Sequence, residues 1–242
     1  MGVVGGPDTV RAGLQALEAI MTFYCLWDRF AHRKALSALH RVRRYQESLG
    51  RHLSAESVAQ IRASIPEWEA RLGTLSSCQQ ATRELVEDLL ANAARRRDEE
   101  RYDDAVARLY RAIEAIAQCR LASAYGIRTN RVRADRVPEP LRSTWAATKP
   151  GSSDLKLGLQ DAYALLNALG DELGKKFCSS SLGDRKHTPL SARNMSILAH
   201  GFTPISPDVC DRMWEEALGL AELIGIRREA LFRFVPLQRR GG

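Results

Sequence analysis

The stretch Tyr102–Tyr125, YDDAVARLYRAIEAIAQCRLASAY, decides the fold class of this 242-residue chain. Its apolar residues recur every three or four positions and form one continuous face: Ala105, Leu109, Ala112, Ile113, Ile116 and Leu121. Gly126 follows the last turn, where a glycine suits a helix end because it tolerates the left-handed conformation. The pattern predicts a long helix with a broad apolar face, which must pack against other helices.

The segments before this helix have the same apolar spacing. They predict a helix over residues 9–44, a second one that Ser54 caps and Pro66 kinks or restarts, and a third over residues 76–94. The charge run of residues 95–104 is typical of a solvated helix end or turn. The N-terminal part of the chain is therefore predicted to be helical throughout.

Residues 126–156 interrupt the pattern with several prolines and glycines. Helices are predicted again over residues 157–173, 189–200 and 208–226, with a Gly/Ser/Lys-rich loop before the second of these. Residues 231–235 alternate in polarity and predict one short strand. The sequence contains no βαβ unit and no P-loop. The fold class is therefore all-α.

The charge balance hints at a polyanionic partner. The net charge is +7, and the segment Gly126–Lys156 holds seven Lys and Arg against three Asp and Glu, a local excess of +4. The longest apolar stretch, Ala12–Trp27, is too short and too polar to span a bilayer. No signal-peptide pattern opens the chain, so we expect a cytoplasmic protein without membrane contact.

The five cysteines lie more than thirty residues apart along the chain. They form no Cys-x-x-Cys or Cys/His cluster, which argues against a zinc site. Four of them stand within apolar helical patterns, so we expect reduced and buried thiols.

Candidate chemistry lies in the predicted helix over residues 189–200, which carries Arg193, Asn194 and His200. Seven positions separate Arg193 from His200, and at about 100° per residue both side chains project from nearly the same face. Histidine can move protons near neutral pH, and arginine can hold phosphate oxygens as their charge develops. These residue types suit metal-free cleavage of RNA, in which the substrate's own 2′-hydroxyl attacks the adjacent phosphorus.

The spacing alone is not evidence, because Arg33 and His40 repeat it. Lys34 follows Arg33 on a long basic helix, which favours a solvated surface there. Asn194 follows Arg193 at the start of a short helix with good capping residues, and Asn194 can orient its neighbours or contact substrate. The context therefore favours the second pair.

Arg193-Asn194 followed by His200 resembles the Arg-polar-x(4–6)-His motif of the HEPN ribonucleases. The segments 102–114, 171–174 and 193–202 are similar to the HEPN half of a group of CRISPR-associated proteins in which a CARF sensor of cyclic oligoadenylate precedes the nuclease. The resemblance covers residues 15–237 and implies an all-α HEPN bundle with an N-terminal helical extension.

The resemblance also implies an activity. HEPN nucleases act as homodimers in which two such motifs form one composite site, without metal or cofactor. The expected reaction is endonucleolytic cleavage of single-stranded RNA in antiviral defence, leaving 2′,3′-cyclic phosphate and 5′-hydroxyl ends. Arg193 would bind the scissile phosphate, His200 would transfer protons and Asn194 would position both. Basic residues expected to hold the RNA backbone are Arg128, Arg131, Arg133, Lys175 and Lys176.

The front of the chain departs from that group, because a complete CARF domain does not fit before the helices. Residues 4–14 are similar to a late stretch of such sensors, but Val4, Pro7 and Asp8 replace its polar ligand-contacting residues. The expected division is a CARF remnant or leader over residues 1–14, a helical extension over 15–100 and the HEPN core over 101–242. A separate CARF sensor or regulatory protein is an expected partner.

The sequence leaves three other hypotheses of function open. The chain could be a non-catalytic helical module that binds RNA or protein, a dimerisation half separated from its sensor, or the toxin of a toxin–antitoxin pair. The residues of the motif distinguish the nuclease from the first two, because only the nuclease requires Arg193 and His200 for cleavage.

Overall fold

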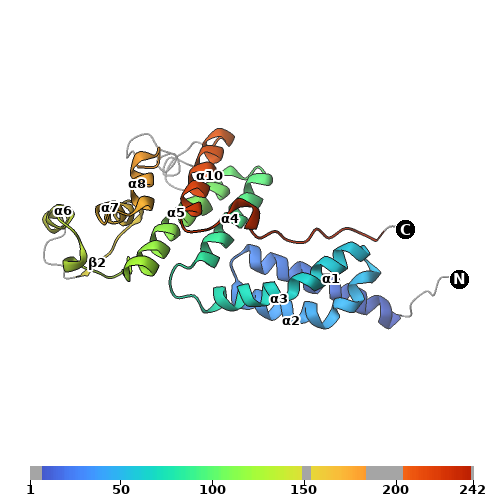
Figure 1. Cartoon of the computed structure of the whole chain (residues 1–242). Helices are drawn as coiled ribbons and strands as arrows, with labels where there is room; N and C mark the ends of the chain where they lie inside the picture. The colour runs from blue at the N-terminus through green and yellow to red at the C-terminus, as the bar shows by residue number, and fades with distance from the viewer. Residues whose placement is uncertain (1–6, 149–153, 184–203, 241–242) are drawn as a thin grey trace. The chain divides into compact units, whose positions relative to one another are not determined.

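The computed structural model describes residues 7–148, 154–183 and 204–240, and these are almost entirely helical (Figure 1). The chain divides into two compact units. Unit 1 comprises residues 1–79 and 233–242, and unit 2 comprises residues 80–232. The helical content of the described residues confirms the all-α fold class. The division predicted from the sequence, into a leader over residues 1–14, a helical extension over 15–100 and a HEPN core over 101–242, stays a prediction.

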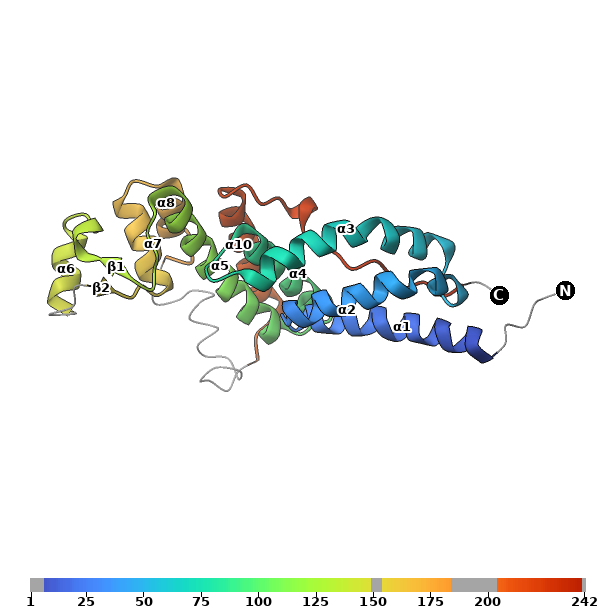
Figure 2. The same cartoon turned by 90° about the horizontal axis from the view of Figure 1, so that it is seen from below.

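Unit 1 is built from three helices, α1 (Pro7–Asp28), α2 (His32–Tyr45) and α3 (Ala55–Ser77), with the 3₁₀ turn Gln46–Arg51 before the third. Helix α2 packs on both α1 and α3 (Figure 2). The aromatic core of unit 1 consists of three buried residues, Phe23, Trp27 and Trp68. The ring centroids of Phe23 and Trp68 are 5.1 Å apart.

The single helix predicted over residues 9–44 is wrong, because the chain turns between α1 and α2. Phe30 adopts φ 57°, its N–H donates to the carbonyl of Trp27, and the N–H of Ala31 donates to the carbonyl of Leu26. This pair of bonds closes a helix C-terminus, usually around glycine. Because Phe30 stands where a glycine is usual, nothing in the sequence indicated that the helix ends there.

Helix α3 begins as predicted, since the Ser54 side chain accepts a hydrogen bond from the N–H of Ser57. It continues through Pro66 to Ser77, so the helix does not restart there. The strand predicted over residues 231–235 is also absent. Instead the C-terminal segment packs within unit 1: Phe234 stacks on Tyr24 at 4.4 Å, and the Tyr24 hydroxyl donates to the carbonyl of Val235.

Unit 2 is organised around α5 (Tyr102–Tyr125), which contacts α4 (Arg83–Asp98), α7 (Leu159–Ala168) and α10 (Pro207–Glu222) (Figure 1). Burial of α5 on several sides explains its long apolar pattern. Gly126 ends it at φ 64°, as predicted. The third predicted helix is displaced: α4 begins after Thr82, whose side chain accepts from the N–H of Leu85.

The part after α5 is less regular. Two short antiparallel strands, β1 (Val132–Arg133) and β2 (Asp154–Leu155), pair in a region where the sequence predicted no strand. Helix α6 (Leu141–Thr148) lies between them in the chain.

The helix predicted over residues 157–173 is two helices, α7 and α8 (Glu172–Ser179), and α8 occupies part of the predicted loop. Gly170 turns the chain between them at φ 78°. Gly174 then brings α8 close to α7, because a Cβ there would lie 2.2 Å from the backbone nitrogen of Asn167. Tyr163 and Phe177 stack across the same contact, with ring centroids 3.8 Å apart.

The expectation that the cysteines are buried is only partly right. All five are free thiols, but Cys25 and Cys178 are exposed and Cys78 is half-buried. Only Cys119 and Cys210 are buried, and burial raises the pKa of Cys210 to about 11. The two exposed thiols lie on solvent-facing sides of their helices, although apolar residues flank both in the sequence.

Candidate functional site

The predicted catalytic residues Arg193, Asn194 and His200 lie outside the described residues, within residues 184–203. Their roles therefore stay predictions. The structure does describe the residues on either side of that segment, up to Gly183 before it and from Pro204 after it.

The turn that follows α8 and ends at Gly183 is firmly packed. Leu182 is fully buried, and its carbonyl accepts from the Gln160 side chain at 3.2 Å. A Cβ at Gly183 would lie 2.7 Å from the carbonyl oxygen of Cys178, so only glycine fits without a shift. Ser181 donates to Glu216 of α10 at 3.1 Å. This turn is therefore held by both α7 and α10.

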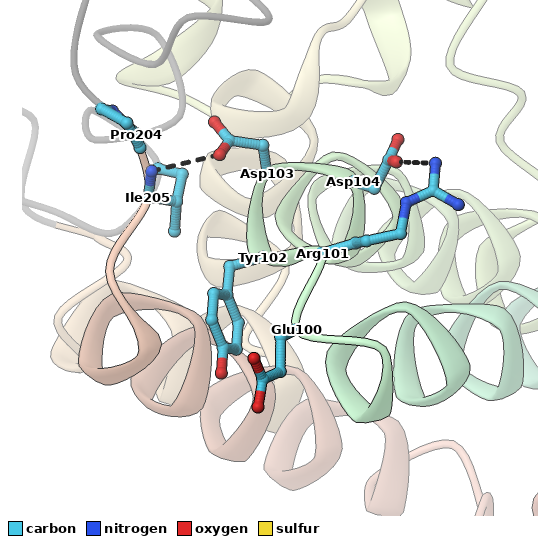
Figure 3. A pocket seen from close by; sticks show the side chains of 7 residues that line it. All are labelled: Glu100, Arg101, Tyr102, Asp103, Asp104, Pro204 and Ile205. Atoms are coloured by element: carbon cyan, nitrogen blue, oxygen red, sulfur yellow. Dashed lines mark hydrogen bonds and ion pairs between the residues drawn. The ribbon is translucent and has the colours of Figure 1, made fainter.

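The chain returns at Pro204 and Ile205, against the first turn of α5. The N–H of Ile205 donates to Oδ2 of Asp103 at 3.2 Å (Figure 3). Ser206 then caps α10 by accepting from the N–H of Val209. A pocket of about 340 Å³ lies at this junction, lined by Glu100, Arg101, Tyr102, Asp103, Asp104, Pro204 and Ile205 (Figure 3).

Arg101 and Asp104 of this pocket belong to a polar network between α4 and α5. Asp104 pairs with Arg101 and Arg108, and Arg108 also donates to the side chain of Asn92. Burial alone would raise the pKa of Asp104, but the two guanidinium groups hold that pKa below its usual value. The start of α5 is therefore fixed by charged contacts as well as by apolar packing.

Three buried polar residues of α4 were not predicted from the sequence. Asp88 and Asn92 are fully buried and Arg96 nearly so, although Asp and Arg are rarely buried without partners. They recur at every fourth position, so they share one face of α4. That spacing was readable in the sequence. The prediction of a solvated charge run over residues 95–104 is wrong for Arg96, which packs inside and pairs with Glu99.

A second ionic cluster fixes the start of α8 around Asp171, whose side chain is only 1% exposed. Its carboxylate accepts from Arg120 at 2.8 Å, from the Tyr125 hydroxyl at 2.9 Å and from the N–H of Leu173 at 2.9 Å. Burial would raise the pKa of Asp171, but these three donors together lower it. The cluster ties α8 to α5.

The five predicted RNA-binding residues are described, and most are engaged within the chain. Arg131 pairs with Asp154 and Arg133 with Asp135, at 2.8 and 2.7 Å. Lys175 pairs with Glu172, and Lys176 donates to the carbonyl of Gly219. Among the described residues, Arg128 alone of the five has no such partner. It is exposed beside the strand β1.

Comparison with known families decides the relationship. The family described as the Csm6 HEPN domain matches residues 74–228, more than half of the chain. The chain belongs to this family. The matched residues coincide closely with unit 2 and include the segment that carries Arg193 and His200. No protein of curated function matches the chain.

Membership places this HEPN domain among CRISPR-associated proteins, and HEPN domains are generally associated with endoribonuclease activity. Among its described residues, no group of three or more His, Cys, Asp or Glu side chains could hold a metal ion. None of the helices described here is both long and apolar enough to cross a membrane.

Proposed function

We propose that this chain is a metal-independent endoribonuclease that cleaves single-stranded RNA in CRISPR-linked antiviral defence. One observation carries the proposal: the Csm6 HEPN match includes an arginine and a histidine at the spacing of the HEPN ribonuclease motif. The competing pair, Arg33 and His40, lies outside the match.

In the proposed reaction, the 2′-oxygen of the substrate attacks the adjacent phosphorus and the 5′-oxygen of the next nucleotide leaves. His200 transfers protons to or from these oxygens. Arg193 neutralises the charge that develops on the phosphoryl oxygens, and Asn194 orients the two. The products carry a 2′,3′-cyclic phosphate and a 5′-hydroxyl.

The proposed site is shared between two copies of the chain, each supplying one motif. The described residues on either side of the segment, Ser181 and Leu182 before it and Ile205 after it, form hydrogen bonds with helices of unit 2.

The product ends test this chemistry. Purified protein should cut a single-stranded RNA in the presence of EDTA, because no metal ion takes part. The new 5′ ends should accept phosphate from a polynucleotide kinase directly, and the new 3′ ends should resist periodate until the cyclic phosphate is opened and removed. Products with 5′-phosphate ends, or cleavage that EDTA abolishes, would refute the proposed mechanism.

A further inference from the structure

The positive charge of the chain is concentrated in unit 1. That unit holds 13 Lys and Arg against 7 Asp and Glu, a net charge of +6, whereas unit 2 holds 23 against 22, a net charge of +1. The local excess over residues 126–156 is therefore offset by acidic residues elsewhere in unit 2. The family match covers only the last residues of α3 in unit 1, so it does not account for this charge.

Helix α2 is the most basic element of unit 1. It contains five Lys and Arg and no acidic residue. Its apolar residues Ala35, Ala38, Leu39 and Val42 are buried against the neighbouring helices. At about 100° per residue, Arg33 and Arg44 project from the side opposite to this buried face, and Lys34 projects from the flank of the helix, about 100° round from Arg33. All three of these side chains belong to exposed residues.

The cations of α2 differ in what they contact. Arg41 pairs with Glu18 and Arg43 with Glu69, at 3.0 and 3.2 Å. Arg33, Lys34 and Arg44 have no ion-pair partner among the described residues. Eleven positions separate Arg33 from Arg44, which is about 16 Å along the helix axis. This row of uncompensated charge is long enough to contact several successive phosphates.

We propose that the surface formed by Arg33, Lys34 and Arg44 binds the sugar-phosphate backbone of RNA. Membrane binding by an amphipathic helix needs an apolar face to insert, and that face of α2 is already buried. A phosphate backbone needs only spaced cations, and arginine suits phosphate oxygens because it can donate two hydrogen bonds at once.

The ligand of this proposal rests on the proposed RNA substrate, but the binding itself does not depend on cleavage. Because the contacts are to phosphates, they carry no base preference. Unit 1 would thereby raise the local concentration of RNA for a chain whose HEPN unit is nearly neutral. The expected signature is a KM effect on long RNA rather than a change in the chemical step.

The experiment measures binding of the full chain to a labelled 2′-O-methyl RNA 20-mer, which cannot be cut by 2′-hydroxyl attack. The test variant is Arg33→Gln/Lys34→Gln/Arg44→Gln. The control, Arg62→Gln/Arg142→Gln/Arg228→Gln, removes three exposed arginines that are paired with Glu47, Glu139 and Glu215. Both variants lose the same charge, and glutamine preserves helix propensity.

Fluorescence anisotropy should show a Kd at least about tenfold higher for the test variant than for the control. Its log Kd against log salt slope should be smaller by about 2, because three phosphate contacts at about 0.7 each are lost. Equal affinities and slopes in the two variants would overturn the proposal and leave an acidic protein as the partner class. If the chain bound in this α2-dependent way but did not cleave RNA, the proposed function would fail and this inference would stand.

Discussion

His200→Ala and Arg193→Ala should each lower the rate of RNA cleavage by about 10³-fold, the size expected for loss of a general acid–base or of a charge-stabilising group. Single-turnover rates in EDTA on a short RNA measure the chemical step without contributions from product release. Asn194→Ala should have a smaller effect, since that side chain is proposed only to orient the other two.

Two other variants serve as matched controls. His40→Ala removes the histidine of the accidental pair, and Arg212→Ala removes an exposed arginine from α10. Both should cleave at the wild-type rate. Full activity in His200→Ala or Arg193→Ala, with contaminating nuclease excluded, would contradict the assigned roles. An equal loss in His40→Ala would show that the pair in α2 had been wrongly set aside.

Asp171→Ala should lower the free energy of unfolding by about 3 kcal/mol. The substitution removes the three hydrogen bonds that the buried carboxylate accepts from Arg120, from Tyr125 and from the N–H of Leu173 at the cap of α8, at about 1 kcal/mol each. For a chain of this size the apparent Tm should fall by about 6–12 °C. Thermal unfolding followed by circular dichroism measures the shift.

The sign of the pH dependence follows from the lowered pKa of Asp171. Its stabilisation is fully present above the pKa that it has in the unfolded chain, about 4, and is lost as the pH falls through the lower folded value. The difference in stability between the wild type and Asp171→Asn should therefore shrink below about pH 4. Asp98→Ala, which removes an exposed acid at the end of α4, should change Tm little. A Tm of Asp171→Ala equal to that of this control would contradict the structural role.

Elements with strong local signals could be predicted from the sequence. The helix Tyr102–Tyr125, its end at Gly126 and the cap Ser54 are as predicted, because period, turn residue and cap all act within a few positions. The turn at Phe30 could not be predicted, because its left-handed conformation is rare for phenylalanine and its sequence carries no breaker.

Long-range contacts decided what the sequence could not. The polarity of the C-terminal residues alternates as in a strand. In the structure Phe234 packs on Tyr24, and the carbonyl of Val235 accepts a hydrogen bond from the Tyr24 hydroxyl and not from a neighbouring strand. The sequence gives no sign that Arg131 is paired, because its partner Asp154 lies 23 positions further along the chain and is brought to it by the pairing of β1 and β2. The charge of unit 1 is evident only once the chain is divided into its two units.

The central claim is that this HEPN chain cuts RNA with the substrate's own 2′-oxygen and without metal. The most direct measurement compares, in EDTA, an RNA oligomer with the same oligomer carrying one 2′-deoxynucleotide 5′ to the scissile phosphate. The account predicts cleavage of the first oligomer at that phosphate and none of the second, with other sites cut in both. Equal cleavage of the two oligomers at that phosphate, or no cleavage of either, would contradict it.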